Sequence, residues 1–439
     1  MTFELVIRGG TILTMDEGYH VLQDHIIGID KGHIKAIFPA AASSYKCGRE
    51  INASGCLVLP GLINGHSHLA MTYFRGLADD MPLMEWLRGY IWPLEGKLVK
   101  PRFVYDATLH GAAEMLKNGI STTNDMYFCM DSVADACSQA GLRVIISEAL
   151  LEHKVVQDEG LASIGTSIKL LNEHYRHDPL ISFSLAPHSI YTCSQNTLKR
   201  CAEVAAKENI LLHMHLSETR DEVETCQKEH GQNPVEYVRE LGYLDTPIIF
   251  AHGVWMDEKE LELLADSKCS SIAVCTESNL KLCSGFAPLK AYLDKGINVC
   301  LGTDGVASNN NLDLLAELSL TTKLHKALNN DPTFLPAKDA LAMVTRDAAR
   351  ALGRGDELGT LEEGKLADIC ILDLHRLENQ PLYNPYSQVV YALGSGSVRD
   401  MIVQGRQVLK NGKVCNVDEE KLMQVSEAYR QRILSELEQ

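Results

Sequence analysis

A single pattern repeats along most of the chain: a short apolar segment, a polar loop, and a stretch with hydrophobic residues at helical spacing. Eight of the apolar segments have the length and composition of buried strands. They are Leu57–Ile63, Ser121–Asp125, Leu142–Ser147, Leu180–Ala186, Ile210–His215, Pro247–Ala251, Ser270–Cys275 and Ile297–Leu301. Eight strand–helix units predict an α/β fold, a (β/α)₈ barrel of the TIM type. A doubly wound open sheet is the alternative, but it would not bring four separate strand ends around one point.

Candidate metal ligands stand at the C-terminal ends of four of these segments. His66 and His68 follow the first segment, where the alternation of side chains along a strand would place both imidazoles on one side. His215 ends the fifth segment, His252 follows the sixth, and Asp304 follows the eighth. In a barrel these ends meet at one face. The alternative, unrelated polar residues where loops begin, requires four coincidences, so the set predicts a site for zinc or iron.

The stretches between the strands carry helix signals. Pro101 stands at a favourable first helical position, and Gly119 stands at a favourable end. A second helix is predicted to begin near Ser194. Such helices would form the outer layer of the barrel.

The two ends of the chain differ from the middle. Residues 1–55 and 358–415 contain short alternating strands, too few on either side for an independent core. We expect both segments to combine into one small β-sandwich domain built from both termini, beside a barrel over residues 56–357. Residues 416–439 are predicted to form a C-terminal amphipathic helix. Packing of that helix against its own chain is favoured over an oligomer contact.

Composition limits the possible partners. The 439 residues include 41 basic and 58 acidic side chains, which give a net charge of −17. This balance opposes binding to nucleic acid or to an anionic membrane, and no apolar run reaches membrane-spanning length. The 13 cysteines form no C-x-x-C pair, which favours reduced thiols and a cytoplasmic location. We expect a small-molecule substrate.

Several stretches resemble known enzymes. The run Pro60-Gly-Leu-Ile-Asn-Gly-His66-Ser-His68 is similar to the first-strand signature of the amidohydrolase superfamily. Other stretches resemble the 5-methylthioadenosine/S-adenosylhomocysteine deaminases and their adenosine- and guanine-type relatives. These stretches are Phe74–Trp86, Tyr90–Glu95, His215–Thr219 and Leu301–Asn310. The resemblance covers essentially the whole chain.

The resemblance implies a role for each candidate residue. It implies one divalent ion, Zn²⁺ or else Fe²⁺, and the implied ligands are His66, His68, His215 and Asp304. Glu218 would transfer protons, and His252 would hold and polarise the attacking water. The implied substrate contacts are Trp86 in the pocket wall, Glu95 on the ribose hydroxyls, and His188. Relatives also suggest a homo-oligomer.

The implied reaction replaces an amino group on a purine-like ring by oxygen. It needs hydroxide near neutral pH, and bound zinc lowers the pKa of water to roughly 7. Protons must reach the ring and the leaving ammonia, a role worth roughly 10²–10⁴-fold that Glu218 could serve, while Asp304 could also accept a water proton. The alternative for Glu218 is a charge at a helix start, with Ser217 capping a helix through Glu222. No strand-end lysine near Ala186 could bridge two metal ions, which argues against a binuclear site.

The chain departs from the family pattern at positions that bear on the substrate. Cys275 and Glu277 replace a histidine and a proline after the seventh strand. Cys275 is expected to be a core thiol, and the alternative is a pocket residue that signals a different ring. Glu148 and Glu152 stand where relatives that accept S-adenosylhomocysteine carry arginines, and they would repel its carboxylate. The alternative is that they face solvent and Lys154 binds this tail.

Three functions are compatible with these residues. The leading one is hydrolytic deamination of an adenine nucleoside such as 5-methylthioadenosine, 5′-deoxyadenosine or adenosine, with S-adenosylhomocysteine a poorer substrate. The second is deamination of a free heterocycle such as guanine, a pterin or a triazine. The changes around Glu277 keep that option open, although Glu95 argues for a ribose. The third is a non-catalytic relative, which the complete set of candidate ligands argues against.

Overall fold

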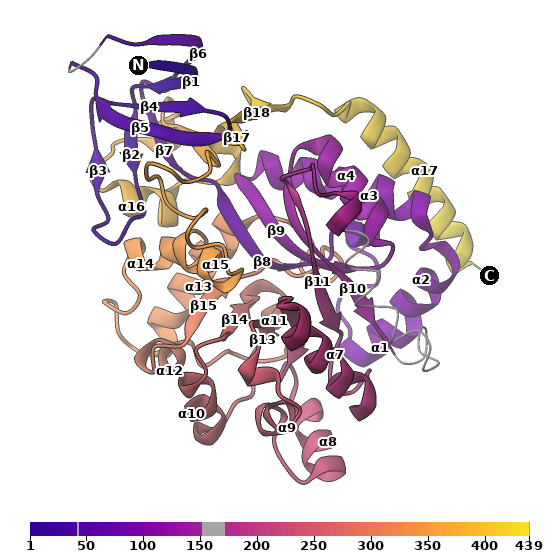
Figure 1. The fold of residues 1–439 in the computed structure, drawn as a ribbon. Coiled ribbons are helices and arrows are strands. Elements are labelled where there is room, and N and C mark those ends of the chain that lie inside the picture. The colour runs from indigo at the N-terminus through magenta and orange to yellow at the C-terminus, as the bar shows by residue number, and fades with distance from the viewer. Residues whose placement is uncertain (42–43, 152–171, 439) are drawn as a thin grey trace.

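The core of the protein is a closed barrel. The computed structural model describes residues 1–41, 44–151 and 172–438. Within these residues, eight parallel strands pair in sequence order, and a bridge between Ser67 and Asp304 joins the first strand to the end of the last. The strands are β8 (Leu62–Ser67), β9 (Ile120–Tyr127), β10 (Arg143–Leu150), β11 (Ile181–Pro187), β12 (Leu212–Leu216), β13 (Ile248–His252), β14 (Ser270–Val274) and β15 (Asn298–Leu301). The predicted (β/α)₈ fold is confirmed (Figure 1).

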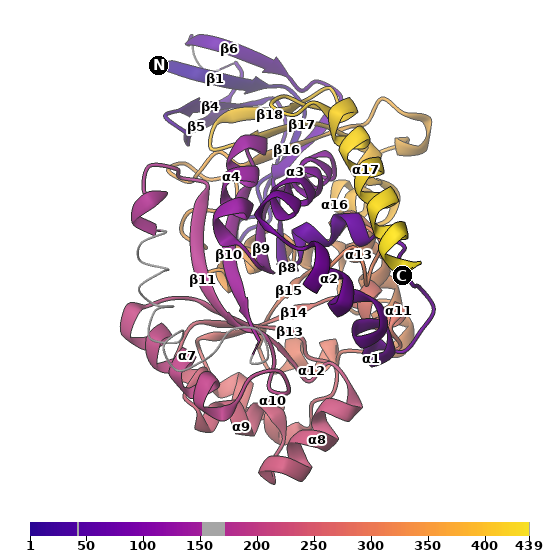
Figure 2. The same ribbon diagram turned by 90° about the vertical axis from the view of Figure 1, so that its right-hand side faces the viewer.

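Helices surround the barrel strands (Figures 1 and 2). Two of these helices begin where the sequence predicts. α3 begins at Pro101, and the Ser194 hydroxyl caps the start of α7 by accepting a hydrogen bond from the Thr197 N–H. The helices up to β16 are α1 (Leu83–Trp86), α2 (Trp92–Leu98), α3 (Pro101–Lys117), α4 (Met130–Ala140), α7 (Gln195–Glu208), α8 (Arg220–His230), α9 (Pro234–Glu240), α10 (Glu258–Asp266), α11 (Thr276–Lys281), α12 (Leu289–Asp294), α13 (Leu314–Leu328), α14 (Ala337–Ala342) and α15 (Arg346–Ala351). No helix in the described part of the chain is both long and apolar enough to span a bilayer.

The prediction of a single first strand over Leu57–Ile63 is wrong. The apolar run Leu57–Ile63 forms two strands, because β7 (Cys56–Pro60) pairs with β16 (Ile369–Asp373) while β8 opens the barrel. Gly61 lies at the break, where a Cβ would collide with the Ser121 hydroxyl. A continuous apolar run carries no signal that the strand changes partner. Residues 56–60, predicted as barrel, therefore belong to a terminal sheet.

Two terminal sheets lie at one end of the barrel (Figure 1). One has the strand order β5–β4–β1–β6, and the other has the order β19–β18–β17–β16–β7–β2–β3. Their remaining strands are β1 (Thr2–Arg8), β2 (Thr11–Leu13), β3 (Val21–Leu22), β4 (His25–Asp30), β5 (His33–Pro39), β6 (Lys46–Asn52), β17 (Val398–Val403), β18 (Arg406–Lys410) and β19 (Lys413–Val414). Ile7 and Ile27 of the first sheet share a buried cluster with Ile371 and Ile402 of the second. The two sheets therefore pack as a sandwich built from both termini, as the sequence predicts.

A buried ion pair joins the barrel to this sandwich. Arg143, at the start of β10, donates from Nε and Nη2 to the two carboxylate oxygens of Asp368, at 2.9 and 3.0 Å. The same guanidinium donates to the Pro179 carbonyl and to Gln404 Oε1. Arg143 is 1% exposed and Asp368 is 5% exposed. A bidentate pair whose guanidinium also donates to two further acceptors holds the barrel and the sheet in one relative position.

The C-terminal helix α17 (Glu419–Leu437) packs against its own chain. Leu422 and Ile433 are buried, and the Tyr429 ring stacks on Tyr73 with 5.0 Å between the ring centroids. The Tyr429 hydroxyl donates a hydrogen bond to Asp106 of α3 at 3.2 Å. Figure 2 shows the helix running down the outside of the barrel.

We expect Asp368→Ala to be strongly destabilising, because it leaves the Arg143 guanidinium buried without its carboxylate. Breaking a buried pair in this way costs about 3–5 kcal/mol. Thermal unfolding followed by circular dichroism should show a clearly lower midpoint temperature. The control is Glu203→Ala, which removes an exposed ion pair with Arg200 and should cost less than about 1 kcal/mol. Equal midpoints for the two variants would contradict the role of the buried pair.

Candidate metal centre and active site

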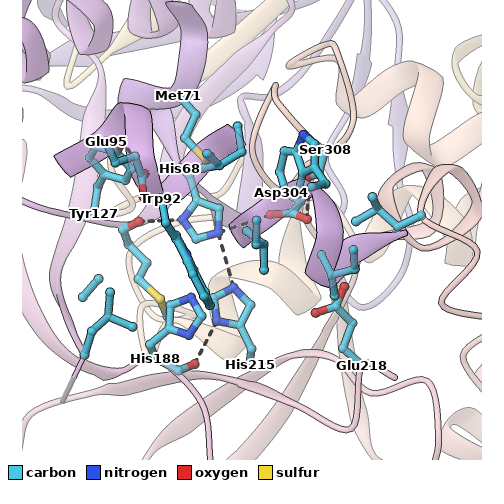
Figure 3. Close-up of a pocket in the computed structure, with 18 of the residues that line it drawn as sticks. His68, Met71, Trp92, Glu95, Tyr127, His188, His215, Glu218, Asp304 and Ser308 are labelled. Carbon is cyan, nitrogen blue, oxygen red and sulfur yellow. Dashed lines mark hydrogen bonds and ion pairs between the residues drawn. The ribbon is translucent and has the colours of Figure 1, made fainter. Parts of the chain in front are cut away.

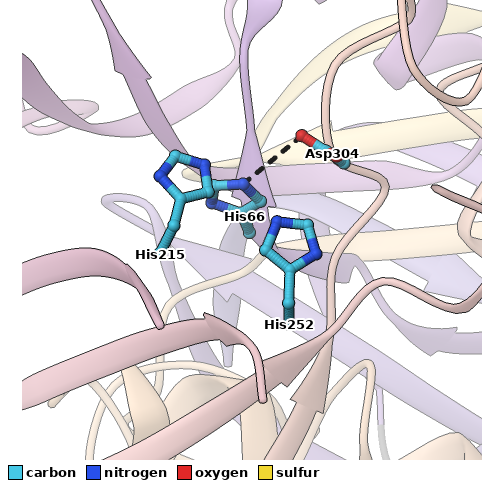
Figure 4. A group of neighbouring side chains, drawn as sticks. All are labelled: His66, His215, His252 and Asp304. Atoms are coloured by element: carbon cyan, nitrogen blue, oxygen red, sulfur yellow. Dashed lines mark ion pairs between the residues drawn. The ribbon is translucent and has the colours of Figure 1, made fainter. Parts of the chain in front are cut away.

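Side chains from four strand ends converge on one point (Figure 4). The ligand atoms of His66, His215, His252 and Asp304 all lie within 4.8 Å of one another. His68 belongs to the same cluster, since its Nε2 lies 3.2 Å from Asp304 Oδ1 and 3.3 Å from His215 Nε2. The Nε2 of His66 lies 3.4 Å from Asp304 Oδ1. The structure therefore brings together all five residues that the sequence places at strand ends.

Each histidine of the cluster is held by a hydrogen bond at its Nδ1 atom. The partners are His213 Nε2 for His66 (2.7 Å), the Met126 carbonyl for His68 (2.6 Å), the His188 carbonyl for His215 (2.8 Å) and Asn279 Oδ1 for His252 (2.9 Å). An oxygen partner of this kind accepts the hydrogen bond, so Nδ1 carries the proton and Nε2 presents its lone pair to the cluster. Partners of this type orient the imidazole ligands of metal sites.

Asp304 is held at both carboxylate oxygens. Oδ1 accepts a hydrogen bond from the Gly305 N–H at 2.7 Å, and Oδ2 accepts from the hydroxyls of Ser278 (2.6 Å) and Ser308 (2.9 Å). Although burial opposes it, the neighbouring histidines hold the pKa of Asp304 well below its ordinary value. The cluster therefore contains a fixed, ionised carboxylate.

The donor set fits a divalent metal ion. His66 is completely buried, and its Nε2 has no hydrogen-bond partner. Burial lowers the pKa of His66 to about 4, so the ring is neutral near pH 7. A buried polar nitrogen is costly unless something binds it. Imidazole nitrogens joined by one carboxylate oxygen suit zinc, and iron is the second choice.

Glu218 and His252 face each other beside the cluster. Their Oε2 and Nε2 atoms are 3.9 Å apart, and the Ser284 hydroxyl donates to Glu218 Oε1 at 3.4 Å. Burial raises the pKa of Glu218. Although burial acts in the opposite direction, the Glu218 carboxylate raises the pKa of His252. A buried carboxyl group that faces a histidine beside a cluster of candidate ligands is placed to act as a general acid or base.

The helix after Glu218 begins differently from the prediction. Thr219, and not Ser217, caps α8 by accepting a hydrogen bond from the Glu222 N–H at 3.2 Å. The chain turns sharply at Ser217, which has a φ of 53°. The Glu222 carboxylate accepts the N–H groups of Ser217 and Glu218 at 3.0 and 2.8 Å. Glu218 therefore lies directly before the cap and lines the cleft.

A cleft of about 710 Å³ opens onto this cluster of candidate ligands (Figure 3). Glu95 and Tyr127 lie at one end and Glu218 at the other, and the Tyr127 hydroxyl donates to Glu95 Oε1 at 2.7 Å. Trp86 and His188 line the cleft, as the family resemblance implies. The apolar wall includes Met71, Leu83, Ile91, Trp92, Phe128 and Leu151.

Cys275 and Glu277, two residues that differ from the family pattern, are not among the described residues that line this cleft. Cys275 is completely buried and its Sγ lies 3.7 Å from the Ala273 carbonyl oxygen, so it is a core thiol, as expected. Glu277 accepts a hydrogen bond from Asn311 Nδ2 at 2.7 Å. The structure therefore places neither residue in the described wall of the cleft.

Glu148 also lies outside the described lining. Burial raises its pKa to about 7, and the backbone amides at the start of α4 oppose that rise. Because side chains alternate along β10, its neighbour Ala149 faces the cleft instead. Glu148 therefore does not contribute the predicted repulsion of a substrate carboxylate. Glu152 and Lys154 lie outside the described residues.

Sequence reasoning missed the residues behind the ligands. His213 stands two positions before His215 on the same strand, so the alternation rule could have found it. Ser278 and Asn279 form a Ser-Asn pair visible in the sequence, but their partners lie on other strands. The role of Tyr127 could not be predicted from the sequence, because its hydrogen-bond partner Glu95 belongs to a helix distant in the chain.

Comparison with known proteins places this site in a family. The model of the amidohydrolase family matches residues 57–408. The chain belongs to this family. It is 39% identical to the 5-methylthioadenosine/S-adenosylhomocysteine deaminase of Thermodesulfovibrio yellowstonii, over 98% of each chain. It is 41% identical to the 5′-deoxyadenosine deaminase of Methanothermobacter thermautotrophicus, over 86% of this chain and 88% of that one.

A solved structure agrees with these relatives. The crystal structure of an adenosine deaminase from Xanthomonas campestris with bound zinc has a TM-score of 0.95 to this amidohydrolase, at 35% identity over 99% of each chain. The predicted family is confirmed.

We expect His213→Phe to weaken zinc binding by this amidohydrolase, because it removes the nitrogen that holds His66 Nδ1. Loss of such a partner costs roughly 10–100-fold in metal affinity. Competition with a chromogenic chelator would measure the change. The control is His325→Phe, which replaces a histidine of α13 that is also buried but, within the described residues, contacts none of the proposed ligands. Equal zinc affinities for the two variants would contradict the role of His213.

Proposed function

We propose that this amidohydrolase is a metal-dependent hydrolytic deaminase of adenine nucleosides, which replaces the ring amino group by oxygen and releases ammonia. The observation that carries the proposal is the single cleft lined by residues of the metal cluster, by Glu218 and His252, and by Glu95. Relatives whose names specify 5-methylthioadenosine, S-adenosylhomocysteine and 5′-deoxyadenosine support the same chemistry.

One divalent ion would be held in the cluster, with zinc as the first choice and Fe²⁺ as the second. The proposed ligands are His66, His68, His215 and Asp304. When bound, the ion lowers the pKa of a water molecule to roughly 7 and so makes hydroxide available near neutral pH. The neutral imidazole of His66, the oriented rings of the other histidines, and the zinc in the adenosine deaminase structure support this assignment.

Glu218 would move the protons of the reaction. In its protonated form it would donate to the ring nitrogen beside the amino-bearing carbon, while hydroxide adds to that carbon. In its ionised form it would take the remaining proton of the water and pass it to the amino group, so that ammonia leaves as the C–N bond breaks. Glu218 lines the cleft with its Oε2 3.9 Å from His252 Nε2, so it lies where both transfers would take place. His252, fixed by Asn279, and Asp304 would accept or donate hydrogen bonds to the water at this end of the cleft.

The nucleoside would lie along the cleft, with its base towards Glu218 and its ribose towards Glu95 (Figure 3). A carboxylate can accept hydrogen bonds from two neighbouring hydroxyls, and the Tyr127 hydroxyl fixes one oxygen of Glu95. Trp86 and the apolar wall would pack against the ring. Burial lowers the pKa of His188 to about 3, so this residue would contact the substrate as a neutral hydrogen-bonding group.

A neutral 5′ substituent suits the cleft better than an anionic one. The charged groups among its described lining residues are Glu95, Glu218 and Asp304, and that part of the lining includes no lysine or arginine. The carboxylate of S-adenosylhomocysteine would lack a guanidinium partner there. Deamination of a free heterocycle is the second candidate, and it is less favoured because Glu277 does not line the described cleft and a free base offers Glu95 no ribose hydroxyls to bind.

Ammonia release by the zinc-loaded enzyme tests the proposed function. Across adenosine derivatives, guanine, pterins and aminotriazines, we expect a nucleoside with a ribose and a neutral 5′ group to be the best substrate. Glu218→Gln should lower kcat by roughly 10²–10⁴-fold, because it removes the acid–base group. Its zinc content should match that of the wild type, since Glu218 is not a proposed ligand. Activity on free heterocycles alone would refute the nucleoside assignment.

The tail preference is tested with a matched pair of substrates. We expect kcat/KM for S-adenosylhomocysteine to be at least about tenfold below that for 5-methylthioadenosine, the effect of one unpaired charged group. The amide of S-adenosylhomocysteine has nearly the same size but no carboxylate charge, so it should recover part of the loss. S-adenosylhomocysteine as the best substrate of the panel would show that the preference is wrong.

A further inference from the structure

The helix after the seventh barrel strand holds two residues of the site at once. The hydroxyl of Ser278 in α11 donates to Asp304 Oδ2 at 2.6 Å. The next residue, Asn279, accepts a hydrogen bond from His252 Nδ1 at 2.9 Å. Both side chains are buried. A shift of this six-residue helix would therefore move the partner of a proposed metal ligand and the partner of His252 together.

Glu317 holds α11 at its first residues. It lies in the first turn of α13, is 0% exposed, and its carboxylate accepts hydrogen bonds from the N–H groups of Thr276 and Glu277. These amides belong to the first turn of α11, which cannot pair them internally. The hydroxyls of Thr276 and Thr321 form a second link between the two helices, at 2.6 Å. The position of α11 is therefore set by α13.

The charge state of Glu317 follows from the same contacts. Burial raises its pKa to about 8, with a further contribution from Glu277, and the two amides oppose this rise. The two N–H groups use both carboxyl oxygens of Glu317 as acceptors. An alanine at this position would remove both acceptors in either protonation state.

We infer that Glu317 is a positioning residue of the active site, acting through Ser278 and Asn279 to set the orientations of Asp304 and His252. Its own contacts are with the backbone of α11, and it does not line the cleft. The inference rests on the proposed metal-dependent function. Metal binding tests it without any substrate.

Glu260 is a matched control within the same chain. It is 1% exposed, and its carboxylate also accepts two backbone N–H groups, from Val235 at 2.9 Å and Asp257 at 3.0 Å. Burial raises its pKa to about 7. These amides stand at the starts of the outer helices α9 and α10, and Glu260 does not line the cleft. Glu260→Ala and Glu317→Ala each remove a buried carboxyl group that accepts two backbone N–H groups, but only Glu317 lies behind the site. One of the two bonds of Glu260 is a capping-box bond within its own helix, whereas both bonds of Glu317 cross to another helix.

The two variants are compared as full-length proteins. Cobalt(II) is loaded in place of zinc, because its visible absorption bands report the geometry of the ligands, and zinc affinity is measured by chelator competition. We expect both variants to unfold at lower temperature. Only Glu317→Ala should shift the cobalt bands, weaken zinc binding roughly 10–100-fold, and lower kcat with little change in KM.

Wild-type cobalt bands and zinc affinity in Glu317→Ala would overturn the inference, as would equal changes in both variants. If Glu317→Ala does not fold, Glu317→Gln and Glu260→Gln replace the pair, since glutamine keeps the volume and one acceptor oxygen. Metal effects specific to residue 317 in an enzyme that deaminates no nucleoside would refute the proposed substrate and leave the inference standing.

A double-mutant cycle tests whether Glu317 affects metal binding through Ser278 and Asn279. If Glu317 acts through Ser278 and Asn279, adding Glu317→Ala to a Ser278→Ala/Asn279→Ala background should weaken zinc binding little further. An undiminished effect in that background would show that the route is wrong.

Discussion

The closure of the barrel between β8 and β15 is the constraint on which the site depends. Asp304 bridges to Ser67, and its N–H donates to the His66 carbonyl at 3.0 Å. This contact places the last candidate ligand of the chain beside the first two. Gly302 permits the approach, since a Cβ there would lie 2.9 Å from the His66 nitrogen. Without closure, the strand ends would form an open edge and the ligand atoms would not share one centre.

Three strand ends are turned inwards by unusual backbone geometry. Ser217, His252 and Asp304 have φ angles of 53°, 74° and 60°, in the left-handed region that residues other than glycine seldom adopt. Such conformations persist where the surroundings determine them strongly. At two of these residues the backbone N–H is itself held, because Ser217 donates to the Glu222 carboxylate and Asp304 donates to the His66 carbonyl. The side chains of His252 and Asp304 are held separately, by Asn279 and Ser278.

Local periodicity explains how much of the molecule could be predicted from the sequence. The barrel follows from eight short apolar segments, and the candidate ligands follow from the rule that barrel strand ends meet at one face. The break at Gly61 could not be predicted, because a change of strand partner leaves an apolar run unaltered. Glu148 shows a second limit: its position near a strand end suggested the pocket, but its place in the alternation turns it away. The contact of Glu317 with α11 depends on how two helices far apart in the sequence pack together, so no local sequence pattern could predict it.

Two segments beside the site are each held by a buried glutamate that accepts two consecutive backbone N–H groups. Glu222 accepts the consecutive amides of Ser217 and Glu218, and Glu317 accepts those of Thr276 and Glu277. Each of these glutamates is buried in the first turn of a helix, where the helix dipole favours a negative charge. A carboxylate with two backbone donors has little freedom to reorient, so it transmits the position of a rigid helix to the turn in front of it. The proton-transfer group and the partners of the metal cluster are in this way supported by helices of the barrel and not by the loops alone.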